Sequence, residues 1–183
     1  MEKTEFLDSF ETTLQGGLVK VCQGAGYLSE GLMESPDLED KWNEYIKDYI
    51  ADAVDNFNDY SEAALAWAAF LGMGVANLWD RNWEKYGLKP YTYYYGSRGW
   101  DNMDEHILYD ILGLDSNAGA KLSDTMDSCA LACLGLMRHE GIETQTSEGF
   151  YCLARAYTVF FRIGASIELE RLAYHKVPLE VKH

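Results

Sequence analysis

The sequence predicts an all-α protein: a single compact bundle of five or six helices around a central apolar helix. Three observations predict this fold. Segments with apolar residues at every third or fourth position cover roughly three-quarters of the chain, far above the usual share of helix. The three prolines, Pro36, Pro90 and Pro178, fall between or beyond these segments, because a helix interior excludes proline. No pair of strands and no internal repeat is visible, and 183 residues suit one domain over 1–183.

The first two helices are predicted from apolar stripes and a start signal. Residues 4–22 carry one apolar stripe, and a glycine-rich connection over 23–34 follows. The tripeptide Ser35-Pro36-Asp37 is typical of a helix start, with serine as N-cap and proline in the first position. The helix that it starts is predicted to reach about residue 60. Its expected core face consists of Leu38, Trp42, Tyr45, Ile46, Tyr49, Ala53 and Phe57.

A third helix over 61–87 is predicted to be the central one, because apolar residues surround its first half on every side. Small residues recur in it every four positions, at Ala64, Ala68, Gly72 and Ala76, and form a groove that a neighbouring helix can approach closely. A tyrosine-rich loop over 88–100 follows. Three more helices are predicted over 101–113, 117–140 and 147–175, the first of them capped by Asp101.

Composition and charge argue against several classes of protein. Thirty acidic and 15 basic residues give a net charge of -15, whereas binding to nucleic acids or anionic membranes requires a basic face. The longest apolar stretch, residues 63–76, is too short to span a bilayer, and the first residues do not resemble a secretory signal. We therefore expect a cytoplasmic protein with no nucleic-acid and no membrane partner.

The four cysteines are too few for a disulfide scaffold and favour a reducing compartment. Cys129 and Cys133 share a helix face, which would suit a pair of soft-metal ligands, but neither a CxxC motif nor a histidine stands nearby. We expect Cys22, Cys129, Cys133 and Cys152 to be small thiols of the core, and no cofactor to be bound.

Acidic side chains form a line along the second predicted helix. They follow one another at spacings of three or four residues, which keeps them on one helix face. The first 60 residues hold 14 acidic and 4 basic residues, or -10 of the total charge of -15. Two interpretations are open: a solvated face that keeps the protein soluble, or a docking surface for a basic partner protein. This acidic face consists of Asp37, Asp40, Glu44, Asp48, Asp52, Asp55 and Asp59.

The loop over 88–100 is the second candidate surface. Large aromatic side chains and an arginine are typical of contact surfaces, and Trp79 and Trp83, one turn apart, would form a wall beside it. The alternative is that these rings fold back over the open end of the bundle. The candidate binding surface consists of Tyr91, Tyr93, Tyr94, Tyr95, Arg98 and Trp100.

Two pairs of aspartates suggest a metal site. Asp101-x-x-Asp104 and Asp124-x-x-Asp127 lie on two helices joined by a short link near residues 113–116, so the helices should run antiparallel. Counted from that link, the two pairs stand at similar heights and are expected to converge on a shared Mg²⁺ ion, which prefers carboxylate oxygens. The alternative is that these residues cap helix ends or face solvent.

In outline this arrangement resembles the ExxE…ExxD motif of the all-α nucleotide pyrophosphohydrolases, the group of MazG and the dimeric dUTPases. The resemblance covers residues 101–127, and aspartate stands at three positions where the family has glutamate. It implies that carboxylates on paired helices hold the metal ions that activate water.

We expect an acidic helical-bundle protein that acts as a protein-interaction or ligand-binding module, without a cofactor and with catalytic residues unknown. The expected partners are a basic protein and a second copy of the chain, because small-residue grooves and aromatic faces suit helix interfaces. The alternative function is a Mg²⁺-dependent hydrolase of nucleotides or phosphate esters that uses the paired aspartates. No motif of nucleophilic catalysis and no nucleotide-binding glycine loop is present.

Overall fold

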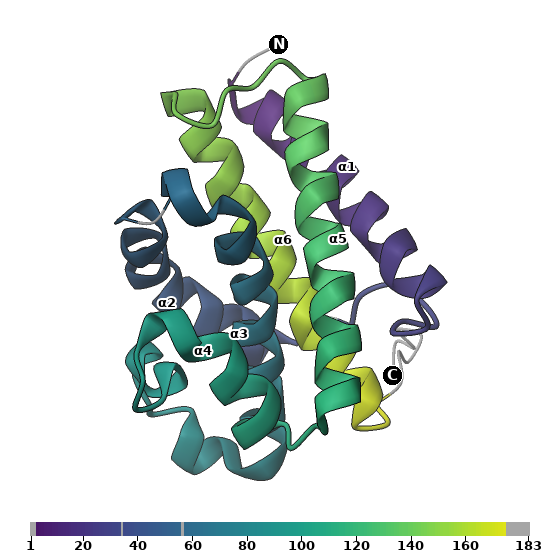
Figure 1. Ribbon diagram of the computed structural model, residues 1–183, viewed down its shortest axis with the longest axis vertical. Helices are drawn as coiled ribbons and strands as arrows, with labels where there is room; N and C mark the ends of the chain where they lie inside the picture. The colour runs from purple at the N-terminus through teal and green to yellow at the C-terminus, as the bar shows by residue number, and fades with distance from the viewer. Residues whose placement is uncertain (1–2, 34, 56, 175–183) are drawn as a thin grey trace, which may run out of the picture.

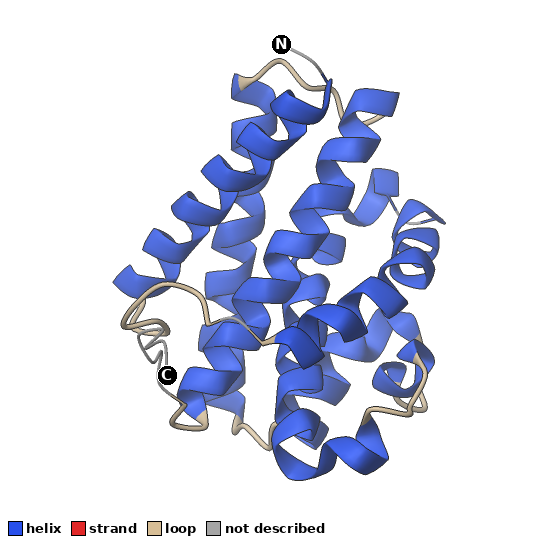
Figure 2. Cartoon of the chain, turned by 180° about the vertical axis from the view of Figure 1, so that it is seen from behind, coloured by secondary structure: helices blue, strands red, loops and turns tan. Residues whose placement is uncertain are grey.

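The structure, a computed structural model, describes residues 3–33, 35–55 and 57–174, with the side chains of 57–61 outside the description. Every regular element in this part of the chain is helical, which confirms the predicted all-α class (Figure 2). Five long helices form the bundle: α1 (Lys3–Gly24), α2 (Pro36–Asp55), α3 (Phe57–Tyr86), α5 (Ser116–His139) and α6 (Ser147–Arg171). Between α3 and α5 lie the short segments η1 (Tyr91–Tyr95), η2 (Trp100–Asn102), α4 (Met103–Glu105) and η3 (His106–Ile111).

Helix α3 is the centre of the bundle, as predicted, and its closest partner is α6. The two backbones meet at glycines. A Cβ atom placed on Gly72 would lie 2.1 Å from the carbonyl oxygen of Phe161, and one on Gly164 would lie 1.8 Å from that of Ala69. The groove of small residues on α3 is therefore filled by α6 of the same chain, and it offers no surface for self-association.

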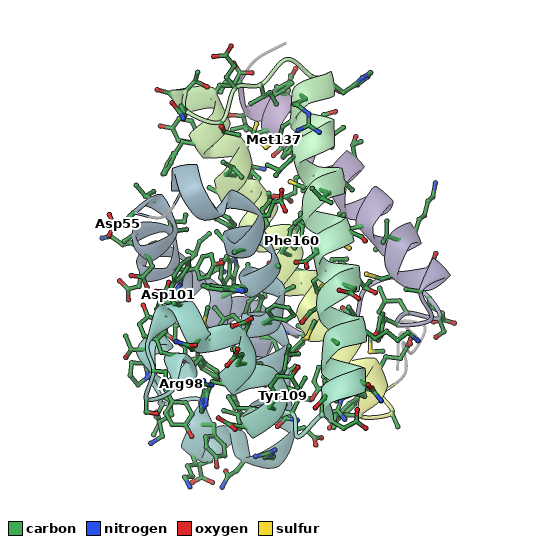
Figure 3. The ribbon with its side chains drawn as sticks, viewed as in Figure 1. Asp55, Arg98, Asp101, Tyr109, Met137 and Phe160 are labelled. Atoms are coloured by element: carbon green, nitrogen blue, oxygen red, sulfur yellow. The ribbon has the colours of Figure 1, made fainter. Side chains whose placement is uncertain are left out.

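The other helices surround this pair. Helix α1 packs against α6 and α5, whereas α2 packs against α3, α6 and the turn η1. Figure 1 shows α5 in front of α6, with α1 on one side of the molecule and α2 on the other. Phe160 of α6, which is fully buried, lies at the centre of the side-chain view (Figure 3).

Two predicted helix ends are wrong. The second helix ends at Asp55 and not near residue 60, and α3 already begins at Phe57. The apolar spacing continues across this junction, from Ala53 to Phe57, so periodicity alone does not mark the break. The last helix ends at Arg171 and not at residue 175, because Ala173 adopts a positive φ of 71° that closes the helix end.

The helix predicted over 101–113 is irregular. It passes from the 3₁₀ turn η2 through α4 into η3, a π-helical segment in which the amide of Leu112 donates to the carbonyl of Ile107 over 2.8 Å. Cations bind the carbonyl groups at its end: Arg81 donates to Ile111 at 2.5 Å, and Arg171 donates to Leu112 at 3.4 Å. Asp101 lies within η2 and is not the N-cap, a position that Gly99 holds.

A buried carboxylate connects Arg171 to the core. Glu168 of α6 is 1% exposed, and Arg171 donates to both of its oxygens, at 2.5 and 2.9 Å. Asn77 of α3 donates to Glu168 from its amide nitrogen at 2.7 Å. These hydrogen bonds compensate the cost of burying a charge in the α3–α6 interface.

Candidate functional site

The acidic face lies on α2, with one exception. Six of the seven predicted acidic residues are on this helix, and five of those six are exposed. The opposite side of α2 is buried at Leu38, Trp42 and Tyr45, which packs the helix on the bundle and directs the carboxylates outward. The exception is Asp59, which belongs to α3 and whose side chain lies outside the described part of the chain.

Aromatic side chains contact the acidic face at two of its residues, Asp37 and Asp52. The indole nitrogen of Trp79 donates to Asp37 at 3.0 Å, and the hydroxyl of Tyr95 donates to Asp52. Burial raises the pKa of Asp52, the nearby carboxylates Asp55 and Asp48 raise it further, and the neighbouring hydroxyl of Tyr91 opposes the increase. Between these two contacts Asp40, Glu44 and Asp48 are exposed, with Glu44 accepting a hydrogen bond from Lys41, and Asp55 is exposed beyond them.

A surface groove runs between this exposed part of α2 and the end of α3. It encloses about 480 Å³ and has four carboxylates on its walls, together with the indole of Trp83 and the exposed side chain of Leu88. Gly87 forms part of the floor, and a Cβ atom there would lie 2.7 Å from the carbonyl oxygen of Trp83. The described lining consists of Asp37, Asp40, Lys41, Glu44, Trp83, Glu84, Gly87 and Leu88.

Lys41 is the single base among the described residues that line the groove, and its charge is already compensated. Its ammonium donates to Glu44 and, at 2.6 Å, to the carbonyl of Gly87 just beyond the end of α3. The same nitrogen lies 5.6 Å from the ring centres of both Tyr45 and Trp83. Lys41 therefore joins α2 to the negative end of α3. The remaining carboxylates keep the groove negative.

The aromatic loop folds back over the bundle. Tyr91 is 3% exposed and Tyr94 is fully buried, so these two residues belong to the core and are not a contact surface. Their rings meet those of Tyr49 and Tyr45 of α2 at 5.9 and 6.0 Å. Burial raises the pKa of both Tyr91 and Tyr94, which keeps the phenols neutral.

Of the other four residues of the candidate loop surface, two are partly buried and two are exposed. Tyr95 is half-buried against Asp52, and Trp100 packs edge-on against Trp67 of α3 at 4.6 Å. Tyr93 and Arg98 are the exposed members, and Arg98 pairs with Glu105 at 3.0 Å. Positive φ angles at Gly96 and Gly99, 73° and 86°, let the chain turn back between η1 and η2.

The two aspartate pairs do not converge. The segment η3 and helix α5, which carry or adjoin the two pairs, touch near the link between them. There Tyr109 packs so closely on Gly119 that a Cβ atom placed on Gly119 would lie 2.5 Å from the tyrosine ring. Beyond that point η3 packs on α3 more extensively than on α5. Figure 3 shows Asp101 beside the loop that carries Arg98.

The charged neighbours of the two pairs are accordingly different. Burial raises the pKa of Asp104, which is next to Glu105 and Arg98, and it raises that of Asp127, which is next to Asp124 and Glu62. In the described ranges, no three His, Cys, Asp or Glu side chains are grouped so that they could hold a metal ion. The expected shared Mg²⁺ site is wrong in its geometry, and the hydrolase alternative loses the observation on which it depends.

The arginines on the outer face of α6 are engaged with acidic side chains of the neighbouring helices α1 and α2. Arg155 pairs with Asp8 of α1 at 2.7 Å, and Arg162 pairs with Glu39 of α2 at 2.7 Å and with Glu11 at 3.3 Å. Arg162 also lines a cleft of about 630 Å³ between α1, α2 and α6. Because residues of the connection 25–35 form part of this cleft, no helical spacing in the sequence indicates it.

Together the fold and the groove define an acidic helical-bundle protein with a negatively charged surface groove between α2 and α3. No protein-family model, no curated protein and no solved structure matches the chain. None of the helices in the described ranges is long and apolar enough to cross a membrane.

Proposed function

We propose that this protein is an interaction module that binds a basic segment of a partner protein through the groove between α2 and α3. The groove supports this proposal because its walls carry Asp37, Asp40, Glu44 and Glu84 around the indole of Trp83. Carboxylates attract lysine and arginine side chains, and an indole face binds the same cations. The exposed Leu88 at the edge supplies an apolar contact.

The distribution of charge supports the same proposal at longer range. The first 60 residues carry -10 of the net charge of -15, and α2, with seven acidic and two basic residues, carries half of that -10. A concentrated negative field accelerates the encounter with a basic partner, and salt weakens this effect. Because Lys41 is bound by Glu44 and Gly87, it contributes little repulsion.

Binding of a fluorescently labelled oligolysine peptide, followed by anisotropy at increasing salt, tests the proposal. The test variant is Asp40→Asn combined with Glu84→Gln, which removes two exposed carboxylates from the walls of the groove. The matched control is Asp124→Asn combined with Asp127→Asn, which removes the same charge from α5, across the bundle from α2 (Figure 1). Each exposed charge is worth about 0.2–1 kcal/mol, so the test variant should bind roughly 2- to 30-fold more weakly.

Two results would overturn the proposal. One is binding that is as strong at high salt as at low salt, since attraction between exposed charges is screened by ions. The other is an equal loss of affinity in the α5 control, which would mean that the peptide responds to net charge and not to the groove.

A further inference from the structure

All four cysteines of the chain are buried, and two of them are in contact across the bundle. The sulfur of Cys22, in the last turn of α1, lies 4.0 Å from the sulfur of Cys129 in the middle of α5. The two residues are 107 positions apart in the sequence, so this contact is made only by the packing of α1 against α5. A shift of the two side chains by little more than a bond length would bring the sulfurs to bonding distance.

The four thiols are not equivalent. The hydrogen bond from Cys129 lowers the pKa of Cys22, an effect that outweighs burial, whereas the pKa of Cys129 itself is raised. Burial raises the pKa of Cys133 to about 12 and that of Cys152 to about 11. Cys22 is thus the thiol that most readily becomes a thiolate, which is the nucleophilic form, and Cys129 is the thiol beside it.

We infer that Cys22 and Cys129 are a redox-active pair that a hydroperoxide oxidises to an intramolecular disulfide joining α1 to α5. In the first step the sulfur of Cys22 attacks one oxygen of the peroxide, the O–O bond breaks, and a sulfenic acid and one water form. In the second step the sulfur of Cys129 attacks the sulfur of Cys22, the S–O bond breaks, and a second water leaves. Two thiols are oxidised and one molecule of hydrogen peroxide is reduced to two waters.

The position of Cys22 provides a route for the oxidant. Cys22 is itself buried, but the helix ends two residues later at Gly24, and Gln23 and Gly24 are exposed. Gly26, with a φ of 85°, turns the chain away from α1 directly afterwards. Opening of this last turn, the part of a helix that opens most easily, exposes Cys22 without disturbing α5.

The bond would also fix one wall of the cleft that Arg162 lines. Gln15 of α1 and Leu32 of the following connection are part of that wall, and Cys22 lies between them in the sequence. In the reduced protein the connection is held to α6 by hydrogen bonds from the amide of Ser29 to Glu170, at 2.8 Å, and from that of Met33 to Ser166, at 3.1 Å. Oxidation would add a covalent link between α1 and α5 to these contacts.

The experiment treats the folded protein with hydrogen peroxide, alkylates the remaining thiols, and maps the peptides by mass spectrometry before and after dithiothreitol. We expect a mass lower by two hydrogen atoms, one crosslink between residues 21–41 and residues 122–138, and a higher melting temperature, all reversed by the reductant. Trypsin leaves Cys129 and Cys133 in one peptide because the nearest basic residues are Lys121 and Arg138. Cys133→Ala therefore serves as the control, and it should retain the crosslink.

Cys129→Ser, which keeps a hydroxyl donor beside Cys22, should abolish the crosslink and leave Cys22 as a sulfenic acid that a dimedone probe captures. If that variant does not fold, fragmentation of the crosslinked peptide from the wild-type protein identifies the bonded cysteine without any substitution. A crosslink to Cys133 or Cys152, a bond between two copies of the chain, or four alkylated thiols after peroxide treatment would each overturn the inference.

Discussion

Replacing Gly164 with alanine should test the central helix contact more directly than any other single change. The added Cβ atom would stand 1.8 Å from the carbonyl oxygen of Ala69 and 2.5 Å from its carbonyl carbon. A carbon and a carbonyl oxygen ordinarily stay roughly 3.3–3.6 Å apart, so α3 and α6 must separate by about 1.5 Å at this point. Both sides of the contact are backbone, and no side chain can rotate away to relieve it.

Such a separation would also loosen the second glycine contact, at Gly72, and the closely packed side chains between the helices. Overpacking of a core costs typically about 1–3 kcal/mol and occasionally more, and we expect Gly164→Ala to lie at or above the upper figure. Against a total stability of about 5–15 kcal/mol, this is a large fraction. Urea unfolding followed by circular dichroism measures it, through the midpoint and the slope.

Gly17→Ala is the matched control for this prediction. Gly17 is exposed on α1, and a Cβ atom there meets nothing within 4 Å. Alanine is favoured over glycine in a helix interior by about 1 kcal/mol, so the control should be more stable than the wild type. If the free energy of unfolding of Gly164→Ala lies within about 1 kcal/mol of the wild-type value, the two helices do not meet at these glycines, and the packing argument fails.

Two further predictions concern helix ends and pH. Ala173 at the end of α6 and Gly141 at the end of α5 both have a φ of 71°, a conformation that glycine adopts more easily than alanine. Ala173→Gly should therefore raise the free energy of unfolding by about 1 kcal/mol, and Gly141→Ala should lower it by a similar amount. Urea denaturation measures both. Burial raises the pKa of Asp52, so the folded chain binds a proton at this carboxyl more tightly than the unfolded chain does. The contribution of Asp52 to stability therefore falls as pH rises through the ordinary pKa of an aspartate and above. The stability of Asp52→Asn relative to the wild type should therefore increase between roughly pH 4 and pH 7, as measured by thermal melts.

Each of these expectations has a clear contrary result. Equal stability of Ala173→Gly and the wild type would mean that Ala173 does not hold the left-handed position. A stability difference between Asp52→Asn and the wild type that stays constant with pH would mean that burial leaves the ionisation of this carboxyl unchanged. If the stability of Asp52→Asn relative to the wild type instead falls as pH rises, Tyr95 and Tyr91 stabilise the charged form of Asp52 more than burial disfavours it.

The helices could be predicted from the sequence because their signals are local. Apolar residues at every third or fourth position identify the core faces of α1, α2 and α6, and Ser35 with Pro36 marks the start of α2. The small residues of α3 predict that another helix comes close, and the contact of Gly72 with Phe161 bears this out. Helix ends were less predictable, since neither the junction after Asp55 nor the positive φ of Ala173 has a proline or glycine to mark it.

The acidic face shows where prediction of the site from sequence stops. Spacings of three and four determine that the carboxylates of α2 share one side of the helix, whatever the rest of the chain does. They do not determine which partners the carboxylates meet. Trp79 binds Asp37, Tyr95 binds Asp52, and Lys41 reaches the end of α3, and each of these contacts joins residues at least 42 positions apart.

The sequence by itself therefore determined the all-helical class, the central position of α3 and the negative charge of α2, because each depends on the order of residues within one helix. Only the tertiary structure decided that Tyr91 and Tyr94 are buried, that the two aspartate pairs form no metal-binding group, and that Cys22 meets Cys129. The physical reason is that these outcomes depend on which helix faces pack together. That choice minimises the exposed apolar surface of the whole chain, and no single segment encodes it.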